Sequence, residues 1–107
     1  MSWMFKGCEN LKEIKGLNNL ITNNVTNMKQ MFCYCNNIIS IDLSNFKTDK
    51  VTDMSFIFKG CSNLKELNIN NFKVNKECIL TDIFNEIDKT KCNLITKEEK
   101  LKNLFLN

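Results

Sequence analysis

The 107-residue chain contains no histidine, no arginine and no proline. Without histidine, it lacks the side chain that most often transfers protons in catalysis. Without arginine, it lacks the side chain that pairs with guanine or phosphate through two parallel hydrogen bonds. All fifteen positive side chains are lysines scattered along the chain, and the formal net charge is only +3. These absences argue against an enzyme and against a nucleic-acid-binding protein.

Motifs that carry chemistry are also missing. The chain has no GxSxG motif, no glycine-rich phosphate loop and no HExxH motif. The tripeptide Cys33-Tyr34-Cys35 places its cysteines two positions apart, whereas zinc sites usually take four ligands from paired CxxC-like clusters. The sequence therefore predicts no catalytic residue, no cofactor and no metal site.

Long apolar runs are absent too. No run approaches the roughly 20 residues that a membrane-spanning helix needs, so we expect no membrane span. The first residues do not show a basic region, an apolar core and a small-residue cleavage site in sequence, so no signal peptide is visible.

The dominant feature of the sequence is an internal repeat. Residues 25–50 read VTNMKQMFCYCNNIISIDLSNFKTDK, and residues 51–76 read VTDMSFIFKGCSNLKELNINNFKVNK. The two copies align without a gap at an offset of 26 residues. Phe32 matches Phe58, and these two rings should be buried and stacked. Self-similarity at a period in the twenties is typical of a stacked solenoid.

Each copy changes its hydrophobic period midway. In the first copy, Met28, Met31, Phe32 and Cys35 have the i, i+3, i+4, i+7 spacing of one helical face. Alternating apolar residues follow, which predicts a strand. We therefore expect one short helix and one short parallel strand per repeat, which makes the fold class α/β. The expected strands lie near residues 12–15, 38–43 and 64–69.

The two ends depart from the repeat. Residues 1–24 match a copy that lacks its front, and residues 77–107 form a degenerate copy. Apolar residues over 79–87 and 97–106 have helical spacing, and Thr96 is a favourable N-cap for the second segment. These segments predict a helical C-terminal cap.

The incomplete first copy leads to two expectations. The chain is either a fragment of a longer array, which we favour, or a natural short protein that opens within a repeat. In both cases the N-terminal apolar face lacks a preceding repeat, which predicts self-association through that end. The residues of this face are Met1, Met4, Phe5 and Leu11.

The repeat pattern V-T-[DN]-M-x-x-[MI]-F-x-x-C-x-N-[LI]-x-x-[LI]-x-[LI]-x-N-F-x-[TV] resembles the BspA-like leucine-rich repeats of bacterial surface proteins, above all the variant found in mycoplasma lipoproteins. The resemblance covers residues 1–76. It implies a short right-handed leucine-rich-repeat solenoid, a cell-surface or extracellular location, and a role in adhesion or protein binding. It implies no catalytic residues. Residues 77–107 lie outside it and would form the cap.

The six cysteines fall into two groups. Three occupy one equivalent position of the repeat and should form a ladder of buried thiols: Cys8, Cys35 and Cys61. Cys33 is aligned with lysines in the other copies, so we expect it to be exposed. Cys78 and Cys92 flank the first predicted cap helix, and a disulfide bridge between them is an open alternative.

One turn position combines two glycines with a tyrosine. Gly7 and Gly60 precede the ladder cysteine, at a helix end where a positive φ angle is common. The middle copy has Tyr34 there. Either this turn tolerates a side chain, or Tyr34 is a strained residue that projects as a binding anchor.

The outward side chains of the predicted strands form the candidate binding face. Such a face carries no aromatic residue and no arginine, which are the usual hot-spot residues of protein interfaces. It is either a solvated surface or a weak, multivalent contact for a protein or a glycan. Its residues are Glu13, Lys15, Ser40, Asp42, Ser44, Glu66, Asn68 and Asn70.

Together these features predict a non-catalytic protein-interaction module of a surface-protein or adhesin type. The alternative is a small effector-like protein that binds a single host or cellular partner. A structural remnant without activity is a third interpretation.

Overall fold

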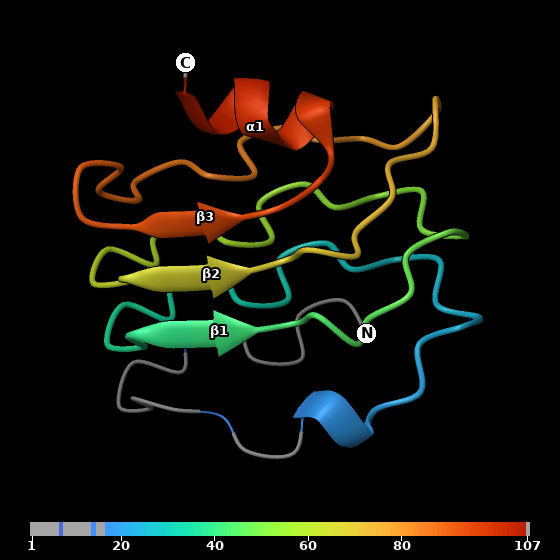
Figure 1. The fold of residues 1–107 in the computed structure, drawn as a ribbon, viewed down its shortest axis with the longest axis horizontal. Coiled ribbons are helices and arrows are strands. Elements are labelled where there is room, and N and C mark those ends of the chain that lie inside the picture. The colour runs from blue at the N-terminus through green and yellow to red at the C-terminus, as the bar shows by residue number, and fades with distance from the viewer. Residues whose placement is uncertain (1–6, 8–13, 15–16, 107) are drawn as a thin grey trace.

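The computed structural model describes Gly7, Ile14 and residues 17–106. Its elements in chain order are the 3-10 helix η1 (Leu17–Asn19), the strands β1 (Ser40–Asp42), β2 (Glu66–Asn68) and β3 (Asn93–Ile95), and the α-helix α1 (Glu99–Leu106). Figure 1 shows the three strands side by side, with α1 beyond β3.

The strands form one parallel sheet in the order β1-β2-β3. Ile41 pairs with Leu67, and Leu67 pairs with Leu94, so each strand is in register with the next copy of the repeat. The predicted strands near 38–43 and 64–69 therefore contain β1 and β2. The strand β3 was not predicted, because the repeat pattern has decayed there. Of the strand expected near 12–15, only Ile14 belongs to the described residues.

The first part of each copy was predicted to be helical, and this is wrong. The amide groups alternate between two kinds of partner. Met31 N donates to Met28 O at 3.3 Å, which closes a tight turn, whereas Phe32 N donates to Ile57 O of the next copy at 2.9 Å. A helix would bond each amide four residues back along its own chain. The chain instead forms a series of turns that bond sideways to the following copy.

Positive φ angles recur at two positions of the copies and prevent a helical path. The first column consists of Gln30, Phe56 and Asp82, with φ angles of 60°, 59° and 50°. The second consists of Tyr34, Gly60 and Glu86, with φ angles of 62°, 78° and 68°. A right-handed helix requires negative φ at every residue, so these positions must lie in turns.

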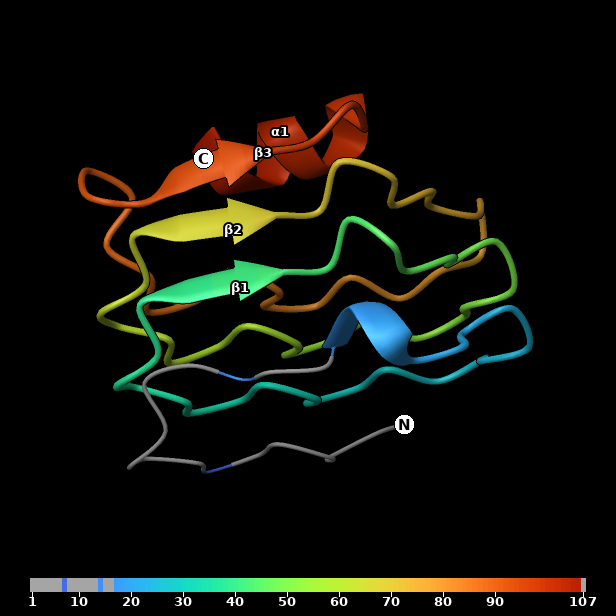
Figure 2. The same cartoon turned by 60° about the horizontal axis from the view of Figure 1, so that its bottom comes forward.

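The predicted leucine-rich-repeat solenoid, with a helix in every repeat and a helical C-terminal cap, is therefore wrong. The described residues contain one α-helix, α1, and one three-stranded parallel sheet, without a repeating helix–strand unit. The segment 79–87, expected to be the first cap helix, contains an isolated bridge at Ile79 and turns over residues 81–86 instead. Figure 2 shows these irregular segments running beside one another along the side of the molecule away from the strands.

The core contains a column of aromatic rings. The Phe32 and Phe58 rings are stacked with their centroids 5.9 Å apart, and Phe58 and Phe84 are stacked at 6.1 Å. Both Phe32 and Phe58 have no exposed surface. The prediction that these two residues are equivalent, buried and stacked is confirmed.

The helix α1 packs on the end of this column. The Phe105 ring meets the Phe84 ring edge to face, with a centroid distance of 5.2 Å. Leu101 is fully buried beside it. Thr96 Oγ1 accepts a hydrogen bond from Glu98 N at 3.2 Å just before the helix begins. The helix therefore lies within the predicted segment 97–106 and is held by its buried side chains.

Candidate functional site: the strand face and the adjoining groove

The exposed side of the sheet carries four of the eight predicted site residues. Ser40 and Glu66 are direct partners in the sheet, and Asp42 and Asn68 are partners one step further along. Ile41, between the two rows, is buried, as expected for a strand with one face on the core. We call the exposed or half-exposed residues Ser40, Asp42, Glu66 and Asn68 the strand face. The strand β3 extends the two rows with two side chains that were not predicted, Asn93 and Ile95.

Glu13 and Lys15, which were predicted to extend the same rows, lie outside the described residues. The same holds for Cys8 and for the residues on which the expected self-association depends, Met1, Met4, Phe5 and Leu11.

Two strand-face residues also shape the chain at the end of their strand. Asp42 Oδ1 accepts a hydrogen bond from Ser44 N at 2.9 Å, and Asn68 Oδ1 accepts one from Asn70 N at 3.1 Å. The bonds from the Ser44 side chain and backbone lower the pKa of Asp42, because they stabilise the charged carboxylate. The chain therefore turns at equivalent points after β1 and β2, and brings Ser44 and Asn70 into a neighbouring groove.

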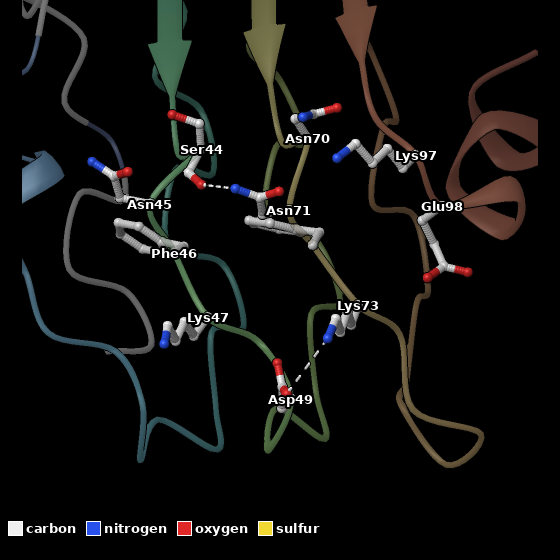
Figure 3. Close-up of a pocket in the computed structure, with 11 residues that line it drawn as sticks. Ser44, Asn45, Phe46, Lys47, Asp49, Asn70, Asn71, Lys73, Lys97 and Glu98 are labelled. Carbon is white, nitrogen blue, oxygen red and sulfur yellow. Dashed lines mark hydrogen bonds and ion pairs between the residues drawn. The ribbon is translucent and has the colours of Figure 1, made fainter.

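This groove lies where the chain leaves the strands. It has a volume of about 540 Å³, which is within the range of small-ligand sites. Figure 3 shows that it is built from three neighbouring segments, 44–49, 70–73 and 97–98. The lining residues are Ser44, Asn45, Phe46, Lys47, Asp49, Asn70, Asn71, Phe72, Lys73, Lys97 and Glu98.

Buried threonines hold two of the groove lysines at equivalent positions. Thr22 Oγ1 accepts a bond from Lys47 N at 2.8 Å and donates one to Lys47 O at 3.2 Å. Thr48 Oγ1 makes the same two bonds with Lys73, both at 2.8 Å. Both threonines are buried. A hydroxyl that satisfies both backbone groups of a residue in the next copy fixes the backbone from which that lysine extends.

The charges of the groove are mixed. Three lysines line it together with Asp49 and Glu98. Lys73 Nζ lies 4.0 Å from Asp49 Oδ2, and both side chains are exposed, so this ion pair is weak. Glu98 Oε2 accepts a long hydrogen bond of 3.4 Å from Val74 N. Lys47 and Lys97 take part in no ion pair within the described part of the chain.

The groove lysines were not predicted from the sequence, although the repeat contains a signal for them. Lys47 and Lys73 are 26 residues apart, and so are the two threonines that hold them. This recurrence of a threonine–lysine pair could have been found by aligning the copies. Lys97 follows β3, where the repeat has decayed, and has no such signal.

Two of the predicted ladder cysteines are confirmed as buried, whereas the prediction for Cys33 is wrong. Cys35 and Cys61 are fully buried, as predicted. Cys33 was expected to be exposed, yet only 1% of its surface is accessible. The equivalent residue Lys59 is half-buried, and its long side chain reaches outward over the Tyr34 and Phe56 rings. The short cysteine side chain at the same position stays covered.

Cys78 and Cys92 are both thiols, so the structure contains no bridge between them. Burial raises the pKa of both, and that of Cys92 reaches about 11. A thiol with a raised pKa is a poor nucleophile because little of it is ionised at neutral pH. Among the residues that the structure describes, no three His, Cys, Asp or Glu side chains are grouped so as to hold a metal ion.

Tyr34 adopts the positive φ angle of its equivalent glycines and remains 41% exposed. Its ring lies over Gly60, where a Cβ atom would come within 2.4 Å of Tyr34 Cδ1. Lys59 Nζ is 5.8 Å from the ring centroid, and a hydrogen bond with Tyr34 raises the pKa of Lys59. The turn therefore accepts a side chain at Tyr34, but it requires glycine at Gly60.

The fold is that of a small protein built on a short parallel sheet with an exposed polar face and an adjoining polar groove. A family model described as "Mycoplasma protein of unknown function, DUF285" matches residues 1–104, and the chain belongs to this family. No curated protein and no solved structure matches the chain. Within the described residues, no helix has both the length and the apolar character that crossing a membrane requires.

Proposed function

We propose that the chain is a non-catalytic binding module of a bacterial surface protein, of the adhesin type. The observation that carries this proposal is the row-by-row pairing of polar side chains on the strand face. Ser40 beside Glu66, and Asp42 beside Asn68, form a continuous surface that leads into the groove. Parallel strands hold such side chains at fixed spacing, so the face is preorganised for a ligand.

Membership of a Mycoplasma family supports a surface-type protein, and so does the resemblance of the repeat to BspA-like surface proteins. A non-catalytic role fits the chemistry of the site. The strand face and the groove contain carboxylates, amides, lysines and two serines, but no histidine to act as a base toward a serine hydroxyl.

The proposal is tested by disrupting the strand face in the whole protein. The double variant Ser40→Lys and Glu66→Lys places two long positive side chains directly opposite each other on the sheet. The matched control, Thr81→Lys and Glu77→Lys, makes the same change in net charge at exposed positions outside the strand face and the groove. Beads coated with each protein are applied to cultured epithelial cells and to purified extracellular-matrix proteins.

We expect beads carrying the wild-type or the control protein to adhere, and beads carrying the strand-face variant to lose at least tenfold in adhesion. Failure of the wild-type protein to adhere to any of these surfaces, or equal losses in both variants, would contradict the proposal. Protease treatment of intact expressing cells tests the location, because a surface protein is digested and an internal one is protected. A protected protein with one tight cellular partner would favour the effector-like alternative.

A further inference from the structure

We propose that the groove beside the strand face binds an acidic oligosaccharide through its lysines, two of which, Lys47 and Lys73, are held by threonine hydroxyls. The inference rests on the proposed binding function and names the ligand class for one part of that surface. The groove is open, most of its lining residues are polar, and its three walls come from three different strand-following segments.

The positions of the lysines are the first argument. Lys47 and Lys73 extend from backbone groups that are held in the same way by Thr22 and Thr48. Adjacent parallel strands lie about 4.8 Å apart, so two lysines in equivalent positions of neighbouring copies start about that far apart. Figure 3 shows Lys47 and Lys73 on neighbouring segments along one side of the groove, and Lys97 on the third segment. The three lysines outnumber the two carboxylates of the lining, Asp49 and Glu98, so the groove carries one excess positive charge, which favours an anionic ligand.

The available charge is the second argument. Asp49 already lies near Lys73, and Glu98 accepts a hydrogen bond from the backbone of Val74. Lys47 and Lys97 have no such partner within the described residues, and both are exposed. Two ammonium groups on different walls of the groove are therefore available to a ligand that carries carboxylates.

The remaining lining favours a saccharide over a peptide. Phe46 and Phe72 contribute to the floor, but only 1% and 3% of their surfaces are exposed, so they offer no pocket for an apolar anchor. The lining contains no tryptophan, tyrosine or arginine, the residues that dominate protein hot spots. It contains three asparagine amides and one serine hydroxyl, which both donate and accept hydrogen bonds as sugar hydroxyls do.

The test measures binding of trigalacturonate to the full chain by calorimetry, with the neutral trisaccharide maltotriose as the comparison. The groove variant is Lys47→Gln with Lys97→Gln. The matched control is Lys65→Gln with Lys100→Gln, which removes the same two charges from exposed positions outside the groove. Circular dichroism confirms that each variant is folded, and amide chemical shifts of the wild-type protein locate the ligand.

We expect trigalacturonate to bind at least tenfold more tightly than maltotriose. The groove variant should lose at least tenfold in affinity, and the control less than twofold. The shifted amides should lie in segments 44–49, 70–73 and 97–98. Binding should also weaken as salt rises, because exposed charges are screened.

Three results would overturn the inference: no binding of trigalacturonate, equal loss in the control, or chemical-shift changes outside the groove. Tighter binding of hexaglutamate than of trigalacturonate would overturn it in favour of an acidic peptide. These outcomes are separate from the bead assay, because the groove variant keeps Ser40 and Glu66 unchanged. Intact strand-face adhesion without saccharide binding would refute the ligand class while leaving the proposed function in place.

Discussion

At the scale of single residues, Phe58 occupies the middle of the stacked aromatic column. Its ring is stacked between those of Phe32 and Phe84 and has no exposed surface. We predict that Phe58→Ala lowers the free energy of unfolding by about 3–5 kcal/mol, because it removes both stacking contacts and leaves a cavity. Urea denaturation measures this change. The control Ile39→Ala, at a residue that is 44% exposed, should cost much less, and similar losses in the two variants would refute the packing argument.

Backbone conformation gives a second prediction at this scale. Glu86 has a φ angle of 68° and is exposed, whereas the equivalent residue of the preceding copy is Gly60. A left-handed conformation costs a residue with a Cβ atom about 1–2 kcal/mol. We expect Glu86→Gly to raise the free energy of unfolding by about 0.5–1 kcal/mol, since glycine also loses more entropy on folding.

The control for this prediction is Glu77→Gly, at an exposed residue that is not among those with positive φ. Glycine should give no gain there. A loss of stability in Glu86→Gly, measured by the same denaturation experiment, would show that the side chain of Glu86 matters more than its backbone strain.

The buried thiol of Cys92 gives a prediction about pH. Burial raises the pKa of this thiol from 9.0 to about 11 in the folded protein. The unfolded chain therefore loses its proton first, and the stabilising contribution of the neutral thiol is full below pH 9.0 and is lost as pH rises through about 11. Thermal melts of the wild type and of Cys92→Ala over pH 7–11 test this. The advantage of the wild type should shrink as pH rises, and a constant gap would contradict the prediction.

At the scale of elements, the sequence indicated which side chains are buried but not what the backbone does. Met28, Met31, Phe32 and Cys35 are all buried, as their spacing predicted. A succession of tight turns with positive φ produces the same inward spacing as a helix. Nothing in the residue types at Gln30 and similar positions marks this conformation, because glycine is its usual signal. Hydrogen bonds between copies determine that these segments form turns rather than helices.

The stability of helix α1 depends on its contacts with the core. Its eight residues are too few for a stable helix in isolation. We predict that Leu101→Ala costs about 2–5 kcal/mol, because Leu101 is fully buried. The control Leu104→Ala, at a residue that is 38% exposed on the same helix, should cost less than half as much. Calorimetric melting gives both values, and equal costs would mean that α1 is held by something other than its buried face.

At the scale of the whole molecule, the sequence predicted part of the candidate site. It placed Ser40, Asp42, Glu66 and Asn68 on one exposed face. The period-two alternation determines the face of the sheet on which each side chain lies, and the 26-residue offset determines which residues of β1 and β2 pair. It did not reveal the groove, since a groove depends on how three loops leave their strands. Such loops are positioned by single bonds, such as that from Asn71 Nδ2 to Ser44 O at 2.6 Å. The repeat pattern contains this asparagine, at Asn45 and Asn71, but the residue type alone does not say which carbonyl group it bonds.

The bonds between copies lead to a last prediction, about cooperativity. Phe32 N donates to Ile57 O, and Phe58 N donates to Ile83 O, so each copy depends on the next for its amide partners. The aromatic column passes through the same copies and ends on α1. Neither copy has a separate core, so opening one should expose the partners of the other. We expect the amides of Phe32 and Phe58 to exchange with deuterium only through global unfolding, with equal free energies that match the value from denaturation. Native-state hydrogen exchange in low urea measures both. If the Phe58 amide exchanged several kcal/mol more easily than the Phe32 amide, the copies would be opening independently from the C-terminal end, and the shared core would not control stability.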